Sequence, residues 1–137
     1  MEVIEDQGIK FEVRMLESLG QKPKGENAFT KKADFDPFMP PFEDGLFITD
    51  LTESHSLVFN KFSVCKEHVI CITKDFVRQD SPLCLKDIQA CLLVMDRLDA
   101  FMFFNCGPHS GASILHKHMQ LIPYHSIGNL PIQQVYD

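Results

Sequence analysis

The chain has 137 residues, a length typical of one domain that can bury its own hydrophobic core. Its formal net charge is -6 and its pI is about 5.4, which argues against a general nucleic-acid-binding surface, because such surfaces are usually basic. No apolar run approaches the roughly 18 residues that span a bilayer, and the acidic segment Met1–Asp6 is unlike a signal or transit peptide. We therefore expect no nucleic-acid partner and no membrane association.

The five cysteines indicate the redox state of the chain. They stand at positions 65, 71, 84, 91 and 106, and none forms a Cys-x-x-Cys pair. An odd number without zinc-ligand spacing is typical of reduced thiols, most of them small buried apolar residues. We therefore expect a cytoplasmic protein, with the nucleus as a second compartment, and no protein-bound metal.

The N-terminal third contains one predicted strand and one long connection. Residues Ile9 to Met15 alternate between apolar and charged side chains, which is the period of a half-buried strand. The stretch Gly20 to Pro41 is polar and contains proline and glycine, so it predicts a long connection. A loop of this length in a small domain is often functional.

The remaining two thirds predict one helix among several short strands. The predicted strands are Leu46–Thr49, Leu57–Phe62, His68–Thr73, Phe101–Phe104 and Leu115–Ile122. Ser81-Pro82 opens a helical pattern, with proline near the first helical position. Its expected buried stripe is Leu85, Ile88, Leu92, Met95 and Leu98. This order favours a single α+β domain over residues 1–137, with a mainly antiparallel sheet and one principal helix.

The segment that carries chemistry lies in the last predicted strand. In an extended strand, side chains two residues apart point to one face, so His116, His118 and Gln120 are expected side by side. The preceding loop, Asn105–Ser113, contains Gly107 and Gly111, which let backbone N–H groups turn toward an anion.

These residues fit nucleophilic attack on phosphorus. Neutral imidazole is a good nucleophile near pH 7 when one ring nitrogen is held by an acceptor and the other is aimed at the phosphate. Gln120 and Ser113 could supply hydrogen-bond donors to the phosphate oxygens. His-x-His alone also fits two half-exposed surface histidines, or two ligands of an incomplete metal site.

The segment from Asn105 to Gln120 closely resembles the active site of diadenosine tetraphosphate phosphorylases, also called ATP adenylyltransferases. This family is a branch of the histidine-triad superfamily in which glutamine replaces the third histidine. Four further blocks resemble the family in the right order: Ile4–Arg14, Asp36–Phe42, Leu57–Phe62, and His68–Phe76 with Gln79. The resemblance covers most of residues 4 to 124 and implies a histidine-triad-like fold.

The resemblance implies a role for each matching residue. His118 matches the nucleophile that takes the adenylyl group, Gln120 the residue that contacts the same phosphate, and His116 a residue that orients or shapes the site. The implied substrate-binding residues are Lys22, Asn60, Lys61, Asn105, Gly111, Ala112 and Ser113. The alignment is loose at Lys22. For His68 a core or surface role is the better interpretation, and His55, His109 and His125 are expected on the surface.

Two features depart from the family pattern. The family usually has glutamine after Gly-Ala-Ser, whereas this chain has Ile114, which lacks the side-chain amide. Family members are also about twice as long, so we expect the chain to correspond to the N-terminal part of their architecture, without the part that completes the substrate pocket.

The implied reaction is phosphorolysis of diadenosine tetraphosphate to ADP and ATP through an adenylyl-histidine intermediate. Its partners are the dinucleoside polyphosphate, ATP, ADP and phosphate, with a divalent cation, magnesium, carried by the nucleotide rather than by a protein cage. Two alternatives stay open: another nucleotide phosphorylase or uridylyltransferase of the same branch, and a truncated, weakly active dinucleotide-binding module. The sequence leaves the oligomeric state undetermined.

Overall fold

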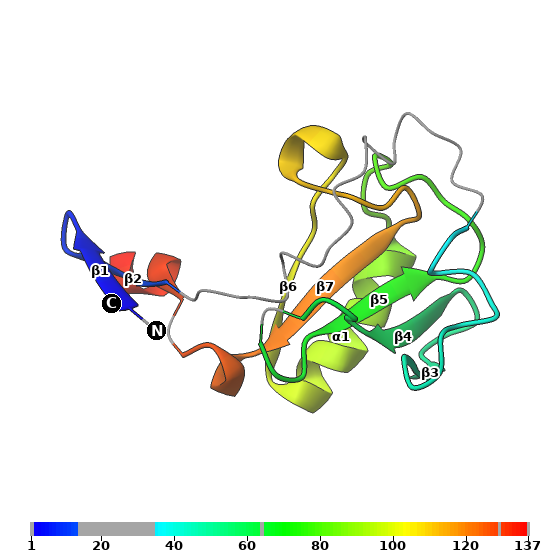
Figure 1. The fold of residues 1–137 in the computed structure, drawn as a ribbon, viewed down its shortest axis with the longest axis horizontal. Coiled ribbons are helices and arrows are strands. Elements are labelled where there is room, and N and C mark those ends of the chain that lie inside the picture. Colours follow the sequence, from blue (N-terminus) through cyan, green and yellow to red (C-terminus); the bar gives the residue numbers. More distant parts are fainter. Residues whose placement is uncertain (1, 14–34, 64, 129, 137) are drawn as a thin grey trace.

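The computed structural model describes residues 2–13, 35–63, 65–128 and 130–136. Its centre is a five-stranded sheet with the strand order β3-β4-β5-β7-β6. The strands are β3 (Phe47–Asp50), β4 (His55–Phe59), β5 (Val69–Thr73), β6 (Ala100–Phe103) and β7 (His118–Pro123). Every neighbouring pair in this sheet is antiparallel. The predicted class, a mainly antiparallel sheet with one principal helix, is confirmed (Figure 1).

Helix α1 (Leu85–Leu98) covers one face of this sheet (Figure 1). Its main buried cluster combines Ala90, Cys91 and Val94 of the helix with Cys71 and Met119 of the sheet. These strand residues share a face because side chains alternate along a strand. We name this the helix face. Cys71 and Cys91 lie together within it, and their hydrogen bond and burial raise the pKa of the Cys71 thiol.

The predicted boundary and buried stripe of the helix were partly wrong. The helix begins after Cys84, whose backbone N–H donates to Asp87 Oδ2 at 2.8 Å, and not at Ser81-Pro82. Leu85 and Leu92 of the expected stripe are exposed, whereas Ala90, Cys91 and Val94 are buried. The side of the helix that faces the sheet therefore carries the small residues Ala90 and Cys91 with Val94, and Leu85 and Leu92 lie on the outer side. A pattern of apolar residues alone did not reveal this orientation.

The opposite face of the sheet carries the second apolar cluster. Val58 of β4 and Ile70 and Ile72 of β5 are buried there beneath Phe38, with Phe42 and Ile114 packed at its edge. His118 is the cross-strand neighbour of Ile72, and Gln120 is the neighbour of Ile70, so both belong to this side. We name it the histidine face. The segment that contains Phe38 therefore lies over the part of the sheet that holds the predicted nucleophile.

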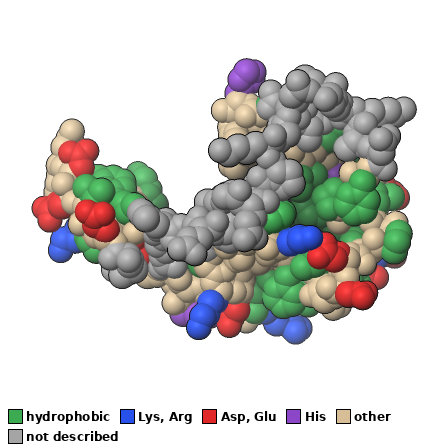
Figure 2. Space-filling model, in the orientation of Figure 1, with side chains coloured by type: hydrophobic (Ala, Val, Ile, Leu, Met, Phe, Trp, Pro, Cys, Tyr) green, Lys and Arg blue, Asp and Glu red, His purple; other side chains and the backbone are tan. Residues whose placement is uncertain are grey.

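The N-terminal strand prediction was correct in part. β2 (Ile9–Val13) pairs with β1 (Glu2–Asp6), which the sequence analysis had not identified, in a separate two-stranded sheet. Nearly all of its residues are exposed rather than half-buried. Gln134, in the 3-10 turn η4 (Pro131–Val135), exchanges two 3.0 Å hydrogen bonds with the Lys10 backbone. The hairpin lies apart from the main sheet, at the left of the view, with acidic and apolar side chains mixed on its surface (Figures 1 and 2).

The other differences are shifts of strand ends. β4 ends at Phe59 rather than Phe62, and β7 begins at His118 rather than Leu115. Most of the predicted connection Gly20–Pro41 falls outside the described residues. Within the described part of the chain, no helix combines the length and apolarity needed to cross a membrane.

Candidate functional site

His118 is the first residue of β7 and is only 7% exposed. Its Nδ1 lies 2.7 Å from the carbonyl oxygen of His116. A carbonyl oxygen only accepts hydrogen bonds, so Nδ1 carries the hydrogen, and in the neutral ring the lone pair is on Nε2. The Phe38 ring packs against the imidazole with 5.0 Å between ring centroids. This arrangement fixes the tautomer and the orientation that a nucleophilic imidazole needs.

His116 lies outside the strand, in an isolated bridge with Arg78. The predicted row of three side chains on one continuous strand is therefore wrong at its first member. Its Nε2 donates to the Thr73 carbonyl oxygen at 2.7 Å, and its Nδ1 lies 2.7 Å from Asp36 Oδ2. Just before β7, the Leu115 carbonyl accepts from the Gln79 N–H and the Lys117 N–H donates to the Val77 carbonyl, while the Lys117 carbonyl accepts from the Thr73 N–H of β5. His116 thus connects the Asp36 segment to β5 and shapes the site.

Lys117, between the two histidines, points to the helix face. Its ammonium lies 2.6 Å from Asp87 Oδ2 and donates to the Pro82 carbonyl at 2.7 Å, and the side chain is almost fully buried. His55 Nε2 lies 2.9 Å from the other Asp87 oxygen. The prediction that His55 is a surface residue was wrong, since it is 2% exposed. Burial acts to raise the pKa of Asp87, but hydrogen bonds from Lys117, the Cys84 backbone and His55 hold that pKa below its ordinary value.

The loop Asn105–Ser113 folds back on itself. Gly107 and Gly111 have φ values of 86° and 90°, a region in which side chains other than glycine are strained. The N–H groups of Gly111 and Ala112 donate to the carbonyls of Pro108 and Gly107, both at 3.1 Å. These two amides therefore close the loop in this conformation instead of pointing to an anion as expected. The exposed Ser113 follows them.

Asn60, His68 and Gln120 form a polar row on the histidine face. Asn60 Nδ2 lies 3.3 Å from His68 Nδ1. Burial lowers the pKa of His68, and an interaction with the Gln120 side chain acts against that shift. His68 is 3% exposed, so of the core and surface roles expected for it the structure shows the core one, and its ring lies beside the Asn60 side chain.

The remaining predicted residues are less closely grouped. Lys61 is exposed and its ammonium donates to Glu43 Oε2 at 2.7 Å. Asn105 lies beside the loop, because its Nδ2 is 4.0 Å from the position that a Cβ on Gly111 would take. Lys22 lies outside the described residues.

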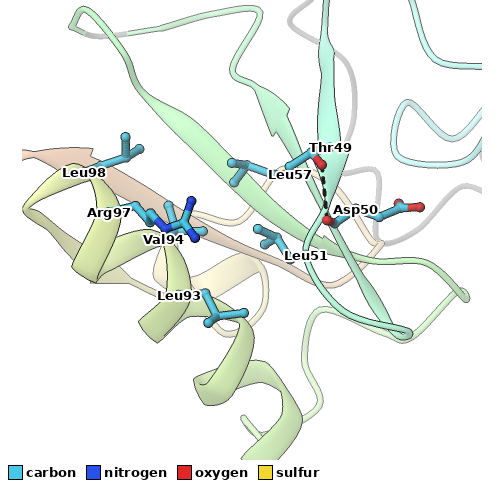
Figure 3. Close-up of a pocket in the computed structure, with 8 residues that line it drawn as sticks. All are labelled: Thr49, Asp50, Leu51, Leu57, Leu93, Val94, Arg97 and Leu98. Carbon is cyan, nitrogen blue, oxygen red and sulfur yellow. Dashed lines mark hydrogen bonds between the residues drawn. The ribbon is translucent and has the colours of Figure 1, made fainter.

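In the part of the chain that the structure describes, these residues coincide neither with a metal cluster nor with a cavity on the helix side of the sheet. Among the described residues, no group of three or more His, Cys, Asp or Glu side chains could hold a metal ion. A cavity of about 550 Å³ lies on the helix side of the sheet (Figure 3). Its lining consists of Thr49, Asp50, Leu51, Leu57, Leu93, Val94, Arg97 and Leu98. The histidines lie on the other face, so this cavity is separate from the candidate site.

Three residues at the site had not been singled out from the sequence. Asp36 and Phe38 contact the histidines from a segment 80 positions away, and Gln79 bonds directly to the His118 backbone. Their only signal in the sequence was that they lie inside blocks that resemble the family. No periodicity or spacing rule connects residues so distant along the chain.

Comparison with known proteins gives consistent results. The family model for the Ap4A phosphorylase N-terminal domain matches residues 1–137. Diadenosine 5',5'''-P1,P4-tetraphosphate phosphorylase 2 of Saccharomyces cerevisiae is 35% identical over 126 residues, covering 82% of this chain and 38% of the yeast protein. The crystal structure of yeast Ap4A phosphorylase Apa2 in complex with Ap4A is similar with a TM-score of 0.76 and 30% identity, covering 98% of this chain and 46% of that one.

The structure of Apa2 in complex with AMP is similar over a shorter range, with a TM-score of 0.64 and 36% identity over 74% of this chain and 38% of that one. The chain therefore spans less than half the length of these relatives. The family match covers every residue, and the resemblance first noted around the two histidines extends through the whole fold. The chain belongs to the Ap4A phosphorylase N-terminal domain family.

Proposed function

We propose that this chain carries the nucleophilic half of a nucleotidyltransferase that phosphorolyses diadenosine tetraphosphate. The observation that carries the proposal is the 2.7 Å hydrogen bond from His118 Nδ1 to the His116 carbonyl, which assigns the reactive lone pair to Nε2. The choice of substrate is supported by the family match and by the similarity to yeast Apa2 in complex with Ap4A.

The proposed reaction has two steps. His118 Nε2 attacks the α-phosphorus of the dinucleotide, so that an N–P bond forms, a P–O bond breaks and ATP leaves. The imidazolium phosphoramidate keeps its Nδ1 hydrogen bonded to the His116 carbonyl. An oxygen of inorganic phosphate then attacks the same phosphorus, the N–P bond breaks, and ADP leaves while His118 returns to its neutral form.

The other groups have supporting roles in this proposal. Gln120 and Ser113 donate to the phosphate oxygens, where charge shifts in the transition state. Asn60, Lys61 and Asn105 hold the nucleotide, and His116 keeps the nucleophile's carbonyl partner in place. A divalent cation, magnesium, neutralises phosphate charge as part of the nucleotide substrate, and no chelating group of this chain is assigned to it. The reduced cysteines support a cytoplasmic location.

Labelled diadenosine tetraphosphate tests the proposal. The chain is incubated with the nucleotide and Mg²⁺ with or without inorganic phosphate, and products and adducts are separated. We expect an acid-labile, alkali-stable adduct without phosphate, and ADP plus ATP when phosphate is added. AMP plus ATP without phosphate would make water the acceptor and contradict the second step.

One alternative is that this region acts as a dinucleotide-binding module without turnover. Relatives are more than twice as long, so residues beyond this region could complete their substrate pocket. Reversible binding without an adduct would support the module. We expect affinity to be weak for this chain alone and to rise when the remainder of a longer relative is supplied. Calorimetry measured side by side with that relative tests this expectation.

A further inference from the structure

The pairing between β6 and β7 stops next to the site. Its last register pair is Phe103 with Gln120, after Met102 with Leu121 and Phe101 with Ile122. If this antiparallel register continued for two more residues, Asn105 would lie opposite His118 and exchange backbone hydrogen bonds with it. The chain instead turns away into the Asn105–Ser113 loop, so β6 does not extend opposite His118.

The side-chain amide of Gln79 takes the place of the missing strand. Its Oε1 accepts from the His118 N–H at 2.7 Å, and its Nε2 donates to the His118 carbonyl at 3.1 Å. The same Nε2 donates to the Asn105 carbonyl at 2.7 Å. The amide thus lies between the two residues that the sheet register would otherwise have paired.

Gln79 is itself held rigidly. Its side chain is fully buried, and its backbone N–H donates to the Leu115 carbonyl at 2.7 Å. The preceding residue, Arg78, forms the bridge with His116. The amide is therefore fixed to the same short segment that holds the first histidine of the motif.

We infer that Gln79 is a positioning residue: its amide sets the spacing between the nucleophile His118 and the Asn105–Ser113 loop. This inference rests on the proposed function of that site. Gln79 Nε2 contacts the carbonyl at the start of the loop and the backbone of the nucleophile, so it acts through these two residues. The geometry of attack on phosphorus depends on such spacing, since an error of about 1 Å can cost roughly 10²-fold in rate.

Two variants at position 79 separate hydrogen bonding from volume. Gln79→Met keeps the length of the side chain and removes all three hydrogen bonds, whereas Gln79→Glu keeps the shape and loses the donor when ionised. Burial raises the pKa of a carboxyl group, so Glu at this position is expected to regain a proton, and with it a donor, as the pH falls toward 6. Val94→Ala, in the helix-face cluster, is the control for general loss of stability.

Adduct formation from diadenosine tetraphosphate is the first readout. We expect Gln79→Met to slow the maximal rate by about 10²-fold, with a smaller change in half-saturating nucleotide concentration, and Val94→Ala to leave the rate near that of the wild type. The rate of Gln79→Glu relative to the wild type should rise as the pH is lowered from 8 to 6. A ratio that is constant with pH, or equal rates in Gln79→Met and Val94→Ala, would overturn the inference.

Amide hydrogen exchange is a second readout that needs no activity. The His118 N–H should exchange at least about tenfold faster in Gln79→Met, relative to Leu121 in the same strand, and should be unchanged in Val94→Ala. Retained protection of His118 would overturn the placement of Gln79. If the wild-type chain forms no adduct, the proposed function fails, and this exchange measurement still decides whether the amide holds the His118 backbone.

Discussion

The two faces of the main sheet bury polar side chains in different ways. On the helix face, Lys117, Asp87 and His55 satisfy one another, and the Lys117 ammonium lies 2.6 Å from a carboxylate oxygen. On the histidine face, His118 uses Nδ1 to bond a carbonyl, which presents Nε2 as the basic nitrogen of the neutral ring. The first arrangement is a closed network, and the second sets the ring tautomer on which the proposed reaction depends.

Three consecutive residues take part in both the helix-face network and the histidine-face arrangement. His116, Lys117 and His118 are consecutive, and the side chain of Lys117 reaches the helix while His118 faces the opposite cluster. Because side chains alternate along the extended chain, Lys117 packs against the helix and His118 lies on the opposite face of the sheet. We infer that variants on the histidine face act on rate, whereas variants of the Lys117 network act on stability.

The largest effect is expected for His118→Asn. In the proposed reaction His118 forms the N–P bond, so turnover should fall by roughly 10⁴- to 10⁶-fold and the adduct should vanish. Mass spectrometry of the adenylylated peptide that spans Ala112 to Ile122 checks this. Gln120→Ala, which removes one donor, should retain slow adduct formation at a rate lowered roughly 10²- to 10³-fold. An adduct that persists in His118→Asn, or that maps to His116, would contradict the assignment.

Asp87→Asn should destabilise the fold with little direct effect on chemistry. It leaves the buried Lys117 ammonium without its carboxylate, a loss of about 3–5 kcal/mol for a broken buried pair. Because the folded-state pKa of Asp87 is lowered from 3.8, its stabilising effect is present above that value and disappears as the pH falls through the lower pKa. The difference in free energy of unfolding between wild type and variant should therefore shrink below pH 3.8.

Denaturant unfolding between pH 7 and pH 2.5 measures this difference. Asp80→Asn is the control, because Asp80 pairs with Arg78 on the exposed surface and its loss should leave the stability unchanged within error. An Asp87→Asn variant as stable as wild type at pH 7 would show that the network on the helix face contributes nothing to folding.

A smaller effect is expected at Asp36, which connects the Phe38 segment to His116. Asp36→Ala removes the partner of His116 Nδ1, so the position of the His116 carbonyl relaxes and the adduct forms about tenfold more slowly. Asp36→Asn retains a hydrogen-bonding group and should recover most of that rate. Single-turnover kinetics with both variants test this, and equal rates for Asp36→Ala and wild type would remove Asp36 from the site.

The sequence predicted local features well and long-range contacts poorly. Short runs of strand-favouring residues placed four strands of the main sheet to within a few residues, because this preference is a local property. The sequence did not show that Leu115 and Lys117 bond to the segment 77–79 just before β7, a contact that no window of consecutive residues contains. His55 was assigned to the surface because nothing near it in sequence predicts the buried partner Asp87.

In the candidate site, too, local motifs were predicted from the sequence and long-range contacts were not. The His-x-His-x-Gln spacing and the glycine loop were visible as short motifs, and their implied roles stay predictions to be tested. Gln79 and Asp36 act through hydrogen bonds to residues 39 and 80 positions away. Such partners are identified only when the fold brings the segments together.

The smallest effect tests the orientation of helix α1. Leu92 belonged to the predicted buried stripe but is 53% exposed, whereas Val94 is 2% exposed. Leu92→Ala in this 137-residue chain should therefore change the free energy of unfolding by less than about 0.5 kcal/mol, as is usual for surface substitutions. Val94→Ala removes fewer carbon atoms but opens a cavity in the packed cluster, and should cost roughly 2 kcal/mol. Urea unfolding of both variants measures the two values.

A larger loss of stability for Leu92→Ala than for Val94→Ala would contradict this orientation. It would mean that the predicted stripe faces the sheet and that the helix is rotated about its axis from the one described. The expected order follows from the burial of Val94, which belongs with Ala90 and Cys91 of the helix and Met119 and Leu121 of β7 to one cluster on the helix face.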